Sequence, residues 1–126
     1  MEMKKLAFYK DLILKEREKT VKIIEGIDKS WSKTIRDSAG DISAYTTHLA
    51  DLASDNNERE KDTATLEREL RNLKKLDIAL RRIYDKTFGI CVFCGAKISE
   101  KRLIAIPFAE MCIKCKRNSE GANNNH

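Results

Sequence analysis

Four cysteines, arranged as two C-x2-C pairs, are the residues of this chain best suited to chemistry. Cys91 and Cys94 form the first pair, Cys112 and Cys115 form the second, and the chain has no other cysteine. This spacing is typical of a four-thiolate zinc site, in which each pair supplies two ligands from one tight turn. Four thiolates fill the tetrahedral shell of zinc, so a metal held in this way is structural rather than catalytic. The sequence therefore predicts one structural Zn²⁺ bound by these four residues.

Two other uses of the cysteines are open at this point. They could form two disulfides, which requires an oxidising compartment. They could also be a thioredoxin-type redox dithiol, which requires a βαβ context that the chain lacks. Gly95, directly after the first pair, favours the zinc interpretation because the tight turn of such a site often needs a residue with positive φ.

The composition indicates long, solvated helices around this site. Charged residues make up 36% of the 126 residues, against roughly 25% in typical globular domains, and there are only one proline and five glycines. The first residues lack the apolar stretch of a signal peptide, and no apolar run reaches membrane-spanning length. We therefore expect a cytoplasmic protein of one domain or a small two-part unit, without a membrane association.

Two helical segments with apolar stripes precede the cysteines. The first is predicted from Lys4 to about Asp37, with Gly40 as a stop signal, and the second from Asn57 to about Lys86. The stripe of the first contains Leu6, Ile13, Thr20, Ile24, Ile27, Trp31 and Ile35, and that of the second contains Leu66, Leu70, Leu73, Leu76, Leu80 and Ile83. The seven-residue recurrence of Leu6, Ile13, Thr20 and Ile27 in the first stripe and the 3- and 4-residue steps of the second are the mark of helices that face one partner. Trp31, Tyr84 and Phe88 are predicted core residues.

Two stripes joined by one connector predict a mainly α fold: a long antiparallel coiled-coil helical hairpin followed by a small C-terminal zinc finger with four cysteine ligands. We expect the hairpin over 1–86, with its tip at about 41–56, the zinc finger over 87–118 and a disordered polar tail over 119–126. A single two-helix seam buries little surface, so the zinc site would stabilise the end of the hairpin where the termini meet. Residues 41–62 carry two Lys/Arg and six Asp/Glu, a net −4 in a chain of net +5, which makes the tip acidic.

The sequence around the cysteines resembles the DksA/TraR family of zinc-finger proteins. The resemblance rests on Phe88-Gly-Ile-Cys91-x-x-Cys94-Gly, on the more specific Arg102-Leu-x-Ala-Ile-Pro107-x-Ala stretch, and on Cys112-Ile-x-Cys115-Lys. It continues upstream to His48, so that it covers some 70 residues. The tip sequence is more similar to Gram-positive members of the family than to proteobacterial ones.

The resemblance implies a bacterial transcription regulator that binds RNA polymerase. In the family the coiled coil enters the secondary channel of the polymerase, the acidic tip approaches the catalytic centre, and initiation is modulated. The resemblance also implies tip residues from a D-x-x-D-x-A pattern. Asp51 and Ala53 match its second Asp and its Ala, whereas His48 stands in place of the first Asp.

Some members of the family bind guanosine tetraphosphate through basic residues near the base of the hairpin. Lys75 and Lys116 match two of these positions, but Ile106 replaces the arginine that is expected before the proline. The loss of a planar, bidentate phosphate ligand counts against this cofactor here.

Three other classes of function compete with this interpretation. A basic zinc module with a coiled coil could bind DNA, but an acidic tip would be repelled by phosphates, so we expect no direct sequence-specific DNA binding. A structural adaptor that docks another protein is the second alternative. An enzyme is disfavoured because no catalytic arrangement or phosphate-binding glycine loop is present and the metal shell is closed. We expect a monomer.

Overall fold

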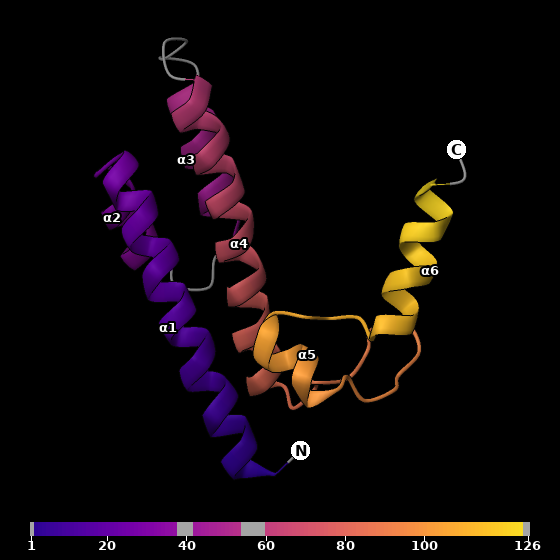
Figure 1. Cartoon of the computed structure of the whole chain (residues 1–126). Helices are drawn as coiled ribbons and strands as arrows, with labels where there is room; N and C mark the ends of the chain where they lie inside the picture. The colour runs from indigo at the N-terminus through magenta and orange to yellow at the C-terminus, as the bar shows by residue number, and fades with distance from the viewer. Residues whose placement is uncertain (1, 38–41, 54–59, 125–126) are drawn as a thin grey trace. The chain divides into compact units, whose positions relative to one another are not determined.

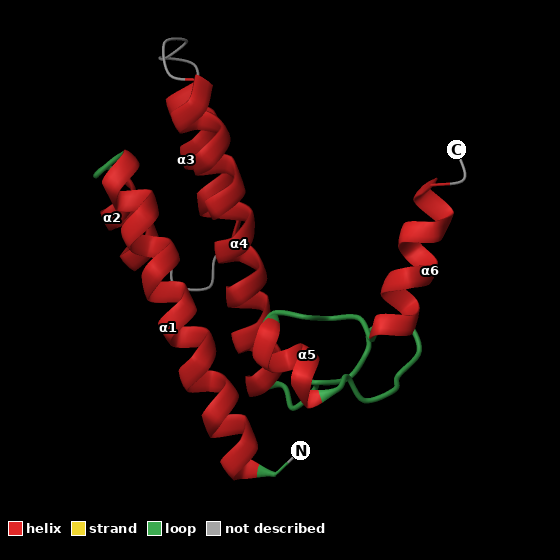
Figure 2. Ribbon diagram, in the orientation of Figure 1, coloured by secondary structure: helices red, strands yellow, loops and turns green. Residues whose placement is uncertain are grey.

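The described part of the protein is mainly helical. The structure, a computed structural model, describes residues 2–37, 42–53 and 60–124, and within them it has helices and loops but no strand (Figure 2). The described helices are α1 (Met3–Ile27), α2 (Trp31–Asp37), α3 (Ile42–Ala53), α4 (Glu60–Tyr84), α5 (Glu100–Ala105) and α6 (Ile113–Asn124). The predicted mainly α class is confirmed, and none of the described helices is both long and apolar enough to cross a bilayer.

The chain divides into two compact units. Unit 1 consists of Met1–Ile13 and Ile78–His126, and unit 2 consists of Leu14–Asp77 (Figure 1). The division passes through α1 and α4, so each of these helices contributes to both units.

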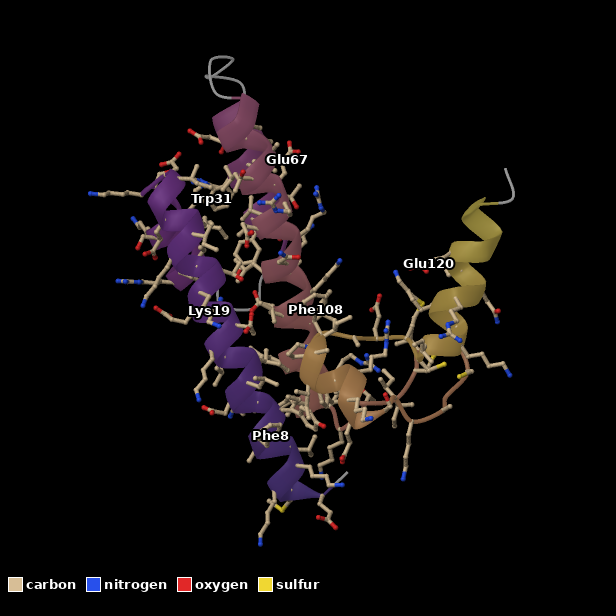
Figure 3. The ribbon with its side chains drawn as sticks, viewed as in Figure 1. Phe8, Lys19, Trp31, Glu67, Phe108 and Glu120 are labelled. Atoms are coloured by element: carbon tan, nitrogen blue, oxygen red, sulfur yellow. The ribbon has the colours of Figure 1, made fainter. Side chains whose placement is uncertain are left out.

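Unit 2 is a small bundle with its own apolar core. Its helices are the end of α1, all of α2 and α3, and the first part of α4. Eight buried side chains form one cluster: Val21, Ile24, Trp31, Ile35, Tyr45, Leu66, Leu70 and Leu73. The buried leucines of α4 confirm the stripe predicted there. Trp31, completely buried, fills much of this core (Figure 3).

The first predicted helix is in fact two helices. We expected one helix to Asp37, whereas α1 ends at Ile27 and α2 begins at Trp31. The break has a local cause, because the backbone N–H of Ser30 donates to the Asp28 carboxylate at 2.9 Å. An aspartate side chain that captures a backbone N–H in this way offers the chain an alternative to the helix. Gly26, the last but one residue of α1, adds to this effect because glycine weakens a helix.

The predicted connector also forms a helix. We expect a connector whose tip lies at about 41–56. Ile42 to Ala53 of it form α3, and residues 41 and 54–56 lie outside the described part. Tyr45 anchors α3 in unit 2 because its side chain is only 1% exposed. An aromatic side chain of this size contributes a large buried area.

A buried ionic network links three helices of unit 2. Asp77 on α4 accepts a hydrogen bond from Arg17 Nε on α1 at 2.7 Å and another from the Tyr45 hydroxyl on α3 at 2.9 Å. Each carboxylate oxygen therefore has its own donor. A buried carboxylate is tolerated only when it is paired and hydrogen-bonded, and both conditions hold for Asp77. Arg17 is thus a specific partner of Asp77.

Unit 1 is built from the two remaining helix ends and the cysteine-rich segment. The rings of Tyr9 and Phe88 pack together with centroids 5.3 Å apart, and Lys5 pairs with Glu100 at 2.7 Å. The side chain of Phe88 is buried. Tyr84 was predicted as a core residue, and this is wrong: it is 82% exposed at the last residue of α4, and Phe88 takes the buried position instead.

The end of α4 has the hydrogen bonds of a Schellman cap. Lys86 adopts φ +63°, its N–H donates to the Ile83 carbonyl at 3.2 Å, and the N–H of Thr87 donates to the Arg82 carbonyl at 2.9 Å. This pattern satisfies the free carbonyls of a helix end and usually has glycine in the left-handed position. The cap turns the chain directly into the segment that carries the first cysteine pair.

Candidate metal centre

The four cysteines come together in unit 1. The Sγ atoms of Cys91, Cys94, Cys112 and Cys115 all lie within 4.8 Å of one another, and those of Cys94 and Cys112 are 3.7 Å apart. A Zn–S bond of about 2.3 Å places the sulfurs of a tetrahedral site about 3.8 Å apart. The four sulfurs therefore fit one zinc ion, whereas a disulfide needs an S–S distance of about 2.05 Å.

The first cysteine pair lies in a tight backbone turn. The N–H of Gly95 donates to the Cys91 carbonyl at 3.0 Å, and the N–H of Cys91 donates to the Ala96 carbonyl at 2.8 Å. Gly95 has φ +73°, which confirms the positive φ expected after the pair. Ile90 and Lys97 form an antiparallel bridge across this turn. These contacts place both sulfurs of the pair on one side of the turn, as a zinc knuckle requires.

The second pair lies at the beginning of α6. Cys112 directly precedes the helix, its Sγ accepts the backbone N–H of Cys115 at 3.5 Å, and its carbonyl accepts the N–H of Lys116 at 3.0 Å. The helix start thus presents both sulfurs of the pair, and Figure 3 shows sulfur atoms close to this end of α6. A backbone bridge joins the two pairs, because the N–H of Val92 donates to the Glu110 carbonyl at 2.9 Å.

The surroundings shift the pKa values of three thiols of this cluster in different directions. Backbone N–H groups, first that of Cys112 and then that of Cys94, lower the pKa of Cys91 to about 6. The N–H of Cys115 likewise lowers the pKa of Cys112. Hydrogen bonding to the sulfurs of Cys112 and Cys91 instead raises the pKa of Cys115 to about 12. Crowded thiolates repel one another, so full ionisation of the set requires a cation, and a divalent ion bound by four thiolates supplies it.

The structure places the other predicted site residues in different settings. Asp51 is exposed in the last turn of α3, and Ala53 is the last residue of that helix. Lys75 is an exposed residue of α4 in unit 2. Lys116 lies in unit 1, where its Nζ is 3.8 Å from Glu120. The two lysines therefore belong to different units.

His48 has a packing role that the sequence did not reveal. We expect it at the polar tip, and its ring packs edge-on against Trp31 with centroids 4.3 Å apart. Its Nε2 lies 3.2 Å from the Ser30 hydroxyl. His48 therefore joins α3 to the start of α2, a role that needs the tertiary structure to be seen.

Residues 86–121 match the family described as "Prokaryotic dksA/traR C4-type zinc finger". The chain is also 32% identical over 102 residues to "RNA polymerase-binding transcription factor DksA" of Escherichia coli (strain K12) and of Salmonella typhimurium, covering 73% of this chain and 66% of each relative. "Uncharacterized protein YteA" of Bacillus subtilis (strain 168) is 41% identical over 73 residues, which is 58% of this chain and 30% of that protein.

A solved structure extends the similarity to nearly the whole chain. The structure of transcription factor DksA2 from Pseudomonas aeruginosa matches with a TM-score of 0.72 and 31% identity, over 98% of this chain and 88% of that one. The chain belongs to the DksA/TraR family. As a family member with four clustered cysteines, it carries one structural zinc ion. The special similarity to Gram-positive members stays a prediction.

Proposed function

We propose that this DksA/TraR protein binds RNA polymerase in the cytoplasm and regulates the initiation of transcription. One observation carries the proposal: the chain shares the fold of transcription factor DksA2 over 98% of its length at 31% identity. The relatives named RNA polymerase-binding transcription factors support the same partner. The chain spans 66% of the length of those relatives, so their activity is assigned to it as a proposal.

The zinc centre has a structural part in this function. We propose Cys91, Cys94, Cys112 and Cys115 as its four ligands. Four thiolates leave no coordination position for a substrate, so the metal supports the fold and we propose no enzymatic activity. Metal binding would hold the segment after α4 in one conformation, and this segment would form the part of the zinc finger that docks on the polymerase.

The regulatory residues are proposed to lie at the end of α3. Asp51 would act near the catalytic centre after entry through the secondary channel, and Ala53 would permit a close approach. The exposed position of Asp51 in α3 supports this assignment. A carboxylate could attract cations or basic loops near a metal-dependent active centre. We do not extend the proposal to guanosine tetraphosphate, because Ile106 replaces the arginine of that site.

Asp51→Asn tests the proposal, because it removes a charge and keeps the shape of the side chain. We expect unchanged affinity in a competition assay with core RNA polymerase and a severalfold weaker effect on initiation in transcription in vitro. Glu67→Gln is the matched control, since Glu67 is an exposed carboxylate on α4 of the same unit (Figure 3). Equal effects of the two variants on transcription would remove Asp51 from the mechanism.

The polymerase itself is tested separately. A pull-down with core RNA polymerase is compared with a DNA shift assay across a salt series. We expect capture of the polymerase and no sequence-specific shift. Binding to DNA without binding to the polymerase would replace this proposal with the DNA-binding alternative. The salt series identifies such binding, because affinity that rests on phosphate contacts falls steeply as the salt concentration rises.

A further inference from the structure

An arginine side chain reaches the carbonyl group directly before each cysteine pair. On the first side, Arg82 Nη2, from the last turn of α4, donates to the carbonyl of Ile90 and to that of Thr87, the latter at 3.1 Å. On the second side, Arg102 Nε, from α5, donates to the carbonyl of Met111 at 3.0 Å. Ile90 and Met111 immediately precede Cys91 and Cys112.

These contacts fix the peptide planes that lead into the metal centre. The carbonyl of Ile90 and the N–H of Cys91 belong to one planar peptide group. Arg82 holds its oxygen, and the Ala96 carbonyl accepts its N–H at 2.8 Å. The orientation of this plane sets the direction in which the Cys91 side chain leaves the backbone. Arg102 restrains the peptide before Cys112 by its oxygen in the same way.

The charge of the arginines suits the same role. A zinc ion with four thiolates carries a formal charge of −2, and a metal centre's own charge must be counted in its surroundings. Arg82 and Arg102 bring two positive charges to the two peptides next to it. Both side chains are half-buried, which limits the screening of these charges by water.

We propose that Arg82 and Arg102 are positioning residues of the zinc centre. They hold the peptide groups before Cys91 and Cys112 in the orientation that zinc binding requires. The chain therefore loses less conformational entropy when the metal binds. Arg82 has a second consequence, because its own carbonyl accepts the N–H groups of Thr87 and Phe88 in the cap of α4. Through this residue the end of α4 and the metal centre stabilise each other.

The neighbouring residues provide matched controls. Arg81, next to Arg82, is exposed and pairs with Asp85 at 3.4 Å on the surface of α4. Lys101, next to Arg102, is exposed on α5. Each control removes one positive charge from the same helix as the arginine that it is matched to.

The test measures zinc affinity of the full chain by competition with a chromophoric chelator. Arg82→Gln and Arg102→Gln should each weaken zinc binding by about 10- to 100-fold, the usual loss when a partner outside the ligand set is removed. Arg81→Gln and Lys101→Gln should retain the original affinity. Cobalt(II) titration gives a second readout, because an altered ligand arrangement changes the absorption bands of the four-thiolate complex.

Two results would overturn the proposal. The first is equal zinc affinity for the arginine variants and their neighbouring controls. The second is a loss of affinity that parallels unfolding of unit 2, reported by the fluorescence of Trp31, because a general folding defect would then explain it. If Arg102→Gln does not fold, Arg102→Lys replaces it and should bind zinc more weakly than Lys101→Gln; equal binding contradicts the assignment.

Discussion

Different interactions stabilise the interior of each of the two units. Unit 2 contains a cluster of eight buried side chains from four helices and one satisfied ionic network around Asp77. The cysteine-rich part of unit 1 instead exposes large apolar side chains. Val92 and Phe93, inside the first cysteine pair, are 54% and 73% exposed, and Ile113, inside the second, is 54% exposed. The buried apolar side chains of this segment are few, chiefly Phe88, Ile98 and Leu103, so we expect the metal to contribute much of its stability.

This difference determines which treatment should destabilise each unit. Hydrophobic stabilisation is spread over many contacts, and its loss is graded with the area that is exposed. Metal stabilisation is concentrated in four bonds, so removal of one ligand or of the ion affects the whole segment. The zinc segment should therefore respond to chelators and the bundle to core substitutions, with little effect of either treatment on the other unit.

Zinc removal should have the largest effect. Structural zinc contributes on the order of 10 kcal/mol to the folding of a small module. Chelation, or Cys112→Ser, should abolish the hydrogen-exchange protection of residues 87–115, while residues 14–27 and 60–77 stay protected and Trp31 fluorescence stays unchanged. Metal analysis should give one zinc per chain before treatment. A metal-free chain that keeps its protection over 87–115 would contradict the structural role of the metal.

A charge in the core of unit 2 should have the next largest effect. Leu73 is completely buried in that core. Leu73→Asp removes its apolar contacts and buries an unpaired ion, so it should lower the free energy of unfolding by more than about 4 kcal/mol. Urea unfolding followed by Trp31 fluorescence measures this loss, and the cobalt(II) spectrum of the four-thiolate centre should survive.

Lys74→Asp is the control for this substitution, because Lys74 is only half-buried. A surface substitution of this kind usually changes stability by less than about 0.5 kcal/mol. Equal losses from the two variants would mean that the stripe of α4 does not define the core.

The metal centre could be predicted from the sequence more completely than the bundle. The four predicted ligands of this chain are all cysteines at short spacings, so the sequence indicates both the ligands and a filled coordination shell. The leucine stripe of α4 was visible for a similar reason, since its period is local. The contacts of Arg82 and Arg102 with the cysteine segments were not predicted. Their acceptors are backbone carbonyls, and a sequence pattern of side chains does not indicate such hydrogen bonds.

The arrangement of unit 2 was harder to predict because most of its determinants are tertiary. The break after α1 depends on Asp28 and Ser30, and such a polar pair is equally common on a helix surface. The helix α3 depends on Tyr45 meeting Asp77, which lies 32 residues away. His48 was assigned to the tip from the D-x-x-D-x-A pattern, and that pattern gives no sign of its contact with Trp31. Most of these features reflect a contact between segments rather than a propensity within one.

Removal of the Tyr45 hydroxyl should have the smallest of the three effects, and its dependence on pH identifies the network. Burial, followed by the negative charge of Asp77, raises the pKa of Tyr45 to about 12. An unfolded tyrosine titrates near pH 10. The folded state therefore binds this proton more tightly, and the contribution is present in full below pH 10 and is lost as the pH rises from about 10 to about 12.

Tyr45→Phe leaves the Asp77 carboxylate with one donor fewer, which should cost about 1.5–3 kcal/mol at pH 7, the usual range for a hydrogen bond to a charged group. Urea unfolding followed by Trp31 fluorescence at pH 7, 10 and 11 measures the free energy of unfolding of the original chain and of the variant. The difference between them should shrink as the pH rises above 10, because only the original chain has this tyrosine to ionise. Tyr84→Phe is the control, since Tyr84 is 82% exposed. A Tyr45→Phe variant that is as stable as the Tyr84→Phe variant at pH 7 would mean that packing alone holds α3 in the bundle.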